Sequence, residues 1–131
     1  MIKITTLVIE NIIQHAKKDA PIEACGYMAG SENIISKSYP MVNIYSSPEH
    51  FSFDEVEQFK VMRLVRDEKL DIMANYHSHP VTPARPSKED IKLAYDPNIL
   101  YFIVSLANGK ESIKAFRIIN SEVEEIEIEI L

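Results

Sequence analysis

The alternation of apolar and polar residues predicts an amphipathic helix near the N-terminus. Thr5 or Thr6 is a suitable N-cap, and Pro21 lies just past the expected end of the helix. The apolar residues recur at helical spacing on one side of the wheel: Val8, Ile9, Ile12, Ile13 and Ala16. We therefore expect this helix to pack one face against the rest of the protein.

Two further helices are expected later in the chain. Residues 53–69 are rich in helix formers, and Ser52 with Glu55 gives a capping-box pattern at their start. The apolar residues of this segment do not form one stripe, so its buried face stays undecided. A short helix is expected from Ser87 to about Tyr95, after a loop that contains three prolines.

Short apolar runs bounded by turn residues predict strands between these helices. The expected strands are residues 22–29, 33–39, 42–45, 71–77, 99–106, 112–119 and 122–131. Pro40 separates two of them, and Asn108-Gly109 is a strong hairpin signal. The last strand alternates apolar residues with glutamates, which suits an edge of a sheet. Strands interleaved with helices predict an α/β fold, a mixed β-sheet flanked by helices.

The composition fits one globular domain spanning residues 1–131, because 46% of the residues are apolar and 26% are charged. A net charge of −6 disfavours nucleic acid as a partner. The N-terminus lacks the apolar stretch of a secretory signal, and the longest apolar run, residues 99–107, is too short to span a bilayer. We expect a cytoplasmic protein without a membrane partner.

Candidate chemistry begins at His77-Ser78-His79, at the end of an expected strand. Residues i and i+2 of a strand point to the same face, so both imidazoles could reach one metal ion. Such a pair alone is weak support for a metal site, because it also occurs by chance.

The segment that follows offers a third ligand. Ser87-Lys88-Glu89-Asp90 fits a capping box in which Ser87 caps the helix and Asp90 closes the box. The proline-stiffened loop could also bring Asp90 back to the strand end, where two histidines and one carboxylate form a ligand set typical of catalytic zinc. The two roles are compatible if one carboxylate oxygen binds the metal and the other meets a backbone amide.

Glu23 is a candidate general base. It is the only charged residue between Ile22 and Gly30, in a segment that otherwise resembles core. A buried ionisable group is costly unless it has a partner or a chemical role. The alternative is that Glu23 lies at the solvent-exposed start of its strand.

Together these residues resemble the JAMM motif of the JAB/MPN-plus metalloprotease family. The motif is a glutamate, then His-Ser-His-Pro, six residues and Ser-x-x-Asp, and it fits Glu23, residues 77–80 and residues 87–90 without a gap. Residues 23–30 and 47–54 are similar to family segments, and the likeness covers most of the chain. The resemblance implies an α/β sandwich similar to that of cytidine deaminases. One departure is Ala74-Asn75, where the family is expected to have glycine and a hydrophobic residue.

The resemblance also implies roles for these side chains. His77, His79 and Asp90 would hold Zn2+, and Glu23 would be the general base that takes a proton from the attacking water. Ser87 would help to stabilise the tetrahedral intermediate.

The function that the resemblance implies is a zinc peptidase or isopeptidase. Its substrate would be the C-terminal tail of a ubiquitin-like or sulfur-carrier protein, cut after Gly-Gly, and both isopeptide cleavage and clipping of a C-terminal extension stay open. The alternative is a catalytically silent MPN-type scaffold, which the complete motif disfavours. A nucleotide deaminase is disfavoured because that class needs a Pro-Cys-x-x-Cys element, and Cys25 is the single cysteine.

The remaining polar candidates carry weaker expectations. Cys25 is expected to be a small core residue, since a reactive thiol needs an accessible, electropositive setting. His15 is expected at the boundary of the first helix, and His50 could border the cleft and contact substrate. Ser78 should point away from the histidines into the scaffold.

Overall fold

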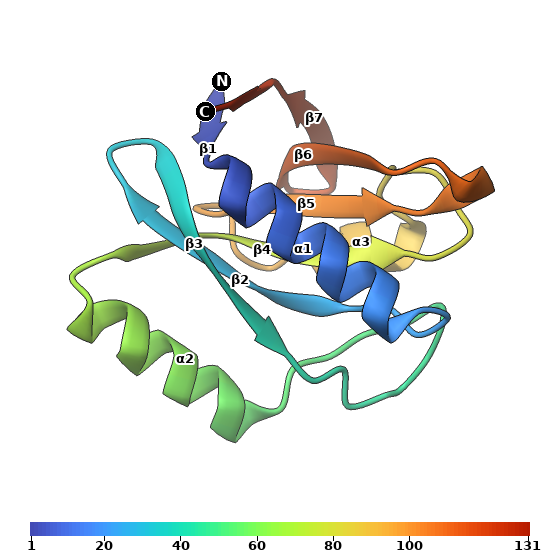
Figure 1. Ribbon diagram of the computed structural model, residues 1–131, viewed down its shortest axis with the longest axis horizontal. Helices are drawn as coiled ribbons and strands as arrows, with labels where there is room; N and C mark the ends of the chain where they lie inside the picture. Colours follow the sequence, from blue (N-terminus) through green and yellow to red (C-terminus); the bar gives the residue numbers. More distant parts are fainter.

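One eight-stranded mixed sheet dominates the computed structural model, which describes all 131 residues (Figure 1). The strands are β1 (Ile2–Ile4), β2 (Cys25–Ser31), β3 (Ile34–Met41), β4 (Asp71–His79), β5 (Leu100–Ser105), β6 (Ser112–Ile119), β7 (Glu122–Ile126) and β8 (Ile128–Ile130). The helices are α1 (Thr6–Asp19), α2 (Glu55–Asp67) and α3 (Lys88–Lys92), with a 3-10 turn at Ala107–Gly109.

The strands run across the sheet in the order β7-β6-β5-β4-β2-β3-β1-β8. β4 pairs with β5 in parallel, as β1 does with β3 and β8, and the other neighbours are antiparallel. The predicted mixed sheet flanked by helices is confirmed. No helix has the length and apolar character needed to cross a membrane.

The helices cover both faces of this sheet, which gives a three-layer sandwich. α1 lies across one face, where Val8, Ile12 and Ala16 join the largest buried cluster with Met28 and Phe102. α2 and α3 pack on the opposite face over two smaller clusters. The predicted first helix is confirmed, and Thr5 is its N-cap, since its side chain accepts a hydrogen bond from the Val8 amide.

Side chains alternate along β4, so that one face of the strand contributes to the hydrophobic core and the other carries the candidate metal ligands. Tyr76 points toward α1, where its hydroxyl meets His15 Nδ1 at 2.7 Å. The Tyr76 ring lies over Gly26 of β2. A Cβ atom at Gly26 would lie 2.6 Å from Tyr76 Cε1 and 2.4 Å from the backbone carbonyl oxygen of Tyr39. Only glycine fits there, and His77 and His79, which alternate with Tyr76 and Ser78 along β4, face α3.

Two expectations about the middle of the chain are wrong. Pro40 does not separate two strands but lies within β3 opposite Gly26, and residues 42–45 form a loop. β1 pairs with β3 only at Ile34 and Ile35, so the far half of β3 is an open edge that tolerates a residue without an amide proton. The cap of α2 is Asp54 rather than Ser52, and its carboxylate accepts from the Glu57 amide.

The expected C-terminal strand is two strands. β7 pairs with β6 at one edge of the sheet, whereas β8 pairs in parallel with β1 at the other edge. Glu127 alone separates them, and its carbonyl accepts from the Ile2 amide at 2.9 Å. The sheet therefore curls until its two edges lie near each other, where the chain ends meet in Figure 1.

Candidate metal centre and its surroundings

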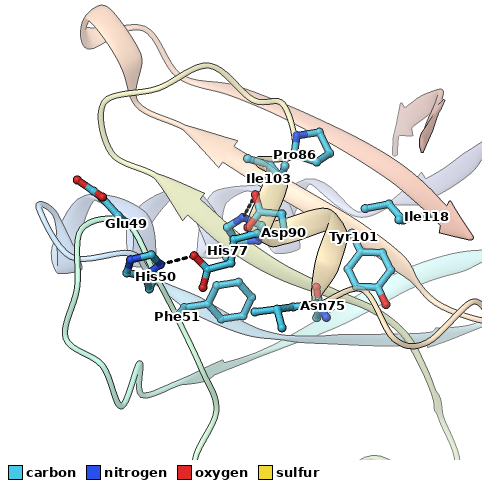
Figure 2. A pocket seen from close by; sticks show the side chains of 12 residues that line it. Glu49, His50, Phe51, Asn75, His77, Pro86, Asp90, Tyr101, Ile103 and Ile118 are labelled. Carbon is cyan, nitrogen blue, oxygen red and sulfur yellow. Dashed lines mark hydrogen bonds and ion pairs between the residues drawn. The ribbon is translucent and has the colours of Figure 1, made fainter. Parts of the chain in front are cut away.

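Three potential ligands converge where β4 meets α3. The distances between His77 Nε2, His79 Nε2 and Asp90 Oδ2 are all 3.1 Å. Both histidines leave the same face of β4, and Asp90 comes from the first turn of α3. Figure 2 shows His77 and Asp90 pointing toward each other. All three side chains are largely shielded from solvent, with exposed fractions of 3%, 6% and 13%.

This triangle fits a tetrahedral cation. Ligands placed about 2.0–2.1 Å from a common zinc ion lie about 3.3–3.4 Å apart, close to the separations in the structure. Two imidazole nitrogens and one carboxylate oxygen direct lone pairs at one point, which is unfavourable unless a proton or a cation lies between them. The three atoms therefore form a group that can hold a metal.

The tautomer of His79 is set by the proline loop. Its Nδ1 lies 2.9 Å from the Pro83 carbonyl oxygen, which can only accept, so Nδ1 carries the proton and donates it there. In the neutral ring, Nε2 is then free to bind a metal. Burial favours the neutral ring, but the contacts with Asp90 and the Pro83 carbonyl outweigh it and raise the pKa of His79 above its usual value.

His77 is held by packing rather than by a second hydrogen bond. Its Nδ1 is buried and has no partner. The ring of Phe51 stacks on the imidazole, with centroids 4.6 Å apart and planes inclined by 20°. Phe51 belongs to the loop before α2, so this loop forms one wall of the site.

Asp90 serves as ligand candidate and capping residue at once. Ser87 Oγ accepts from the Asp90 amide at 3.0 Å, and the Ser87 amide donates to Asp90 Oδ2 at 2.9 Å, which completes the capping box. The same carboxylate oxygen, Oδ2, makes both the contacts with the histidines and the contact with the Ser87 amide. Burial alone would raise the pKa of Asp90, but its contacts with the histidines and the Ser87 amide hold it well below its ordinary value.

Glu23 is buried beside this cluster, with an exposed fraction of 4%, so a solvent-exposed position is excluded. The Ser78 amide donates to the Ala24 carbonyl, and the Ala24 amide donates to Ser78 Oγ. Extending this antiparallel pairing by one residue sets Glu23 opposite His79. Its Oε1 has no hydrogen-bond partner, and burial raises the pKa of Glu23 to about 8.

The hollow in front of the cluster is built by the loop before α2, by α3 and by β5. His77 and Asp90 line this hollow, whereas Glu23 and His79 do not. His50 at the rim pairs with Glu89 of α3, as the dashed line in Figure 2 shows. The lining residues are Glu49, His50, Phe51, Asn75, His77, Pro86, Glu89, Asp90, Leu93, Tyr101, Ile103 and Ile118.

The other candidate residues lie apart from the metal group. Cys25 is fully buried, and burial raises the pKa of its thiol to about 12, so the thiol stays protonated. His15 bridges Tyr76 and Asp19 on the face covered by α1. Ser78 points into the scaffold as expected.

Sequence reasoning missed two supports of the site. The stacking of Phe51 on His77 joins segments that are distant in the chain, although residues 47–54 resemble a segment of the family. The Pro83 carbonyl is a backbone atom, so no side-chain pattern could reveal it.

Comparison with known proteins places this arrangement in a family. Residues 6–119 match the family described as prokaryotic homologs of the JAB domain. Among characterised relatives, the CysO-cysteine peptidase of Mycobacterium tuberculosis is 36% identical over 120 residues, 89% of this chain and 82% of that protein. A probable TtuB-protein conjugate cleaving protease of Thermus thermophilus is 34% identical over 87 residues, 66% of this chain and 58% of that protein.

Solved structures share the fold. A Desulfitobacterium hafniense protein solved in solution is 40% identical, with a TM-score of 0.91 over 100% of this chain and 93% of that chain. A JAB1/MPN domain protein of Archaeoglobus fulgidus shares the fold at 23% identity, with a TM-score of 0.68 over 99% of this chain and 97% of the other. The predicted JAB/MPN sandwich is confirmed. The chain therefore belongs to the JAMM family, as one of the prokaryotic homologs of the JAB domain.

Proposed function

We propose that this JAMM-type hydrolase is a zinc-dependent peptidase or isopeptidase that cleaves the bond after the Gly-Gly end of a ubiquitin-like or sulfur-carrier protein. The observation that carries the proposal is the convergence of His77 Nε2, His79 Nε2 and Asp90 Oδ2 within 3.1 Å of one another. One relative is named for CysO-cysteine and another for TtuB-protein conjugates, which supports a small protein modifier as substrate.

His77, His79 and Asp90 would hold the ion, and their donor set of two imidazoles and one carboxylate leaves a position for a reactant. When bound there, zinc supplies Lewis-acid polarisation of the scissile carbonyl and lowers the pKa of water. The Pro83 carbonyl keeps His79 in the tautomer whose Nε2 can bind, and Phe51 limits rotation of the His77 ring.

Glu23 acts as the general base. Its carboxylate takes a proton from the attacking water and delivers it to the leaving nitrogen as the carbon–nitrogen bond breaks. Support comes from its burial beside His79, its unpartnered Oε1 and a pKa raised to about 8, near the range where proton uptake and release are both easy.

Ser87 donates a hydrogen bond to the oxyanion that develops on the scissile carbonyl. Its Oγ already accepts from the Asp90 amide, which fixes the hydroxyl oxygen at the start of α3 while the hydroxyl proton stays available. The capping box therefore orients both Asp90, the proposed metal ligand, and the Ser87 hydroxyl, the proposed hydrogen-bond donor.

The test is cleavage by the zinc-loaded protein of ubiquitin-like and sulfur-carrier proteins from its own source, each extended beyond Gly-Gly and weighed by mass spectrometry. The expected product ends at Gly-Gly. Glu23→Gln should keep one zinc per chain and lose turnover by about 10²–10⁴-fold, since it removes the base and keeps the ligands. His79→Ala should lose both the zinc and the turnover. His15→Gln, a change at a histidine outside the metal group, should keep zinc.

Two results would contradict the proposal. Full turnover by Glu23→Gln would show that Glu23 is not the general base. A wild-type protein that binds no zinc and cleaves no extended tail supports the alternative of a catalytically silent scaffold.

A further inference from the structure

An unsatisfied amide lies in the wall of the hollow. The Oδ1 atom of Asn75 is buried and has no hydrogen-bond partner. An amide kept from water without a partner destabilises the folded state by about 1–3 kcal/mol. Its neighbours on the sheet do not pair with it. The Tyr101 hydroxyl is fully used, since it accepts from the Asp96 amide and donates to the Asp96 carbonyl, and the Tyr27 hydroxyl accepts from Gln58 Nε2 and makes no hydrogen bond with Asn75.

Asn75 lies where the hollow opens into a longer groove. A second, larger depression runs between α2 and α3 over the same face of the sheet, and it is lined mostly by apolar side chains. The two depressions share Phe51, Asn75, Glu89, Leu93 and Tyr101 as lining residues. Figure 2 shows Asn75 between Phe51 and Tyr101, so a chain that passes from the groove to His77 crosses this amide.

The spacing along β4 relates Asn75 to a definite position in an extended substrate. Asn75 and His77 are two positions apart on β4, about 6.6–6.8 Å, and point to the same face. A residue of an extended peptide presents its N–H and C=O on the same side, and a primary amide supplies one acceptor and a donor group to match them. Two residues of extended substrate therefore bridge the reacting carbonyl and Asn75.

We propose that Asn75 binds the main chain of the substrate tail at the residue that precedes the terminal Gly-Gly pair, accepting its N–H and donating to its C=O. This inference rests on the proposed function and names what holds the tail in register with the metal. It predicts recognition of the backbone rather than of a side chain at that position.

The test pairs one protein change with one chemical change. Wild type and Asn75→Ala, both zinc-loaded, are measured for binding and cleavage of two tail peptides carrying a C-terminal extension. One peptide is unmodified, and the other carries an N-methyl group on the residue before Gly-Gly. Asn11→Ala, at an exposed position of α1 on the opposite face of the sheet, is the matched control.

For wild type, N-methylation should lower kcat/KM and peptide affinity about tenfold, the value of one lost hydrogen bond with its acceptor left unpaired. With the unmodified peptide, Asn75→Ala should show about the same tenfold loss of kcat/KM and affinity relative to wild type. N-methylation should cause no additional loss in this variant, and its zinc content should be unchanged. Asn11→Ala should match wild type. Since the wild-type amide is unsatisfied, Asn75→Ala should not lower the melting temperature enough to unfold the protein.

Equal losses on methylation in wild type and Asn75→Ala, or wild-type kinetics in the variant, overturn the role of Asn75. Binding that depends on Asn75 without any cleavage overturns the proposed function alone. A wild-type protein that binds neither peptide overturns both.

Discussion

The burial of Glu23 predicts that Glu23→Gln makes the metal-free protein more stable, and increasingly so as pH rises. The carboxyl has an ordinary pKa of 4.5, and burial raises its pKa to about 8 in the folded chain. Between these values folding takes up a proton, so the free energy of unfolding of wild type falls as pH rises and levels off above pH 8. Glutamine has the same shape and no charge to desolvate.

The magnitude follows from the two pKa values. At 1.36 kcal/mol for each unit, the carboxyl lowers wild-type stability by about 4 kcal/mol between pH 5 and pH 9. Local relaxation reduces this, so the gain of Glu23→Gln over wild type should grow by about 2–4 kcal/mol across that interval.

The assay is urea unfolding followed by circular dichroism at pH 5, 7 and 9, with a chelator present. Glu10→Gln, an exposed change on α1, is the control and should follow wild type at every pH. A stability difference between Glu23→Gln and wild type that is the same at pH 5 and pH 9 would refute the reasoning that burial suppresses ionisation of this carboxyl.

Three further predictions concern the metal, the wall of the site and the sheet. Zinc affinity should fall on acidification from pH 8 to pH 5, because the raised pKa of His79 puts protons in competition with the metal; a chelator competition that shows no change contradicts this. Phe51→Ala should cost about 1 kcal/mol of stability through the lost stacking on His77, whereas an unchanged urea midpoint argues against that contact. Gly26→Ala should unfold the protein or lower its melting temperature far more than Gly109→Ala, where nothing lies near the added Cβ; equal effects rule out the proposed clash.

Local patterns in the sequence were sufficient for the elements that have one clear face. The first helix was predicted with its cap, and the strand at residues 112–119 was predicted with its bounds. Pro40 misled because a proline ends a central strand but not an open edge, and edges depend on the pairing of the whole sheet. Alternation predicts one strand in the tail, because it does not show that Glu127 divides these residues between the two opposite edges of the sheet.

In the site, too, local patterns predict some features, whereas others depend on contacts between distant segments. Strand periodicity alone put His77 and His79 on one face, and the capping-box pattern gave the local geometry of Asp90. The burial of Glu23 depends on its pairing with the far strand β4, which no local pattern contains. The unsatisfied amide of Asn75 is visible only when the partners of its neighbours are known.

X-ray absorption at the zinc edge of the zinc-loaded protein tests the central claim most directly, because it counts the atoms around the ion. Two imidazole nitrogens and carboxylate or water oxygens at about 2.0–2.1 Å are expected, and His79→Ala should lose the bound zinc. A sulfur neighbour at about 2.3 Å, or a zinc shell that persists unchanged in His79→Ala, would contradict a centre built from His77, His79 and Asp90.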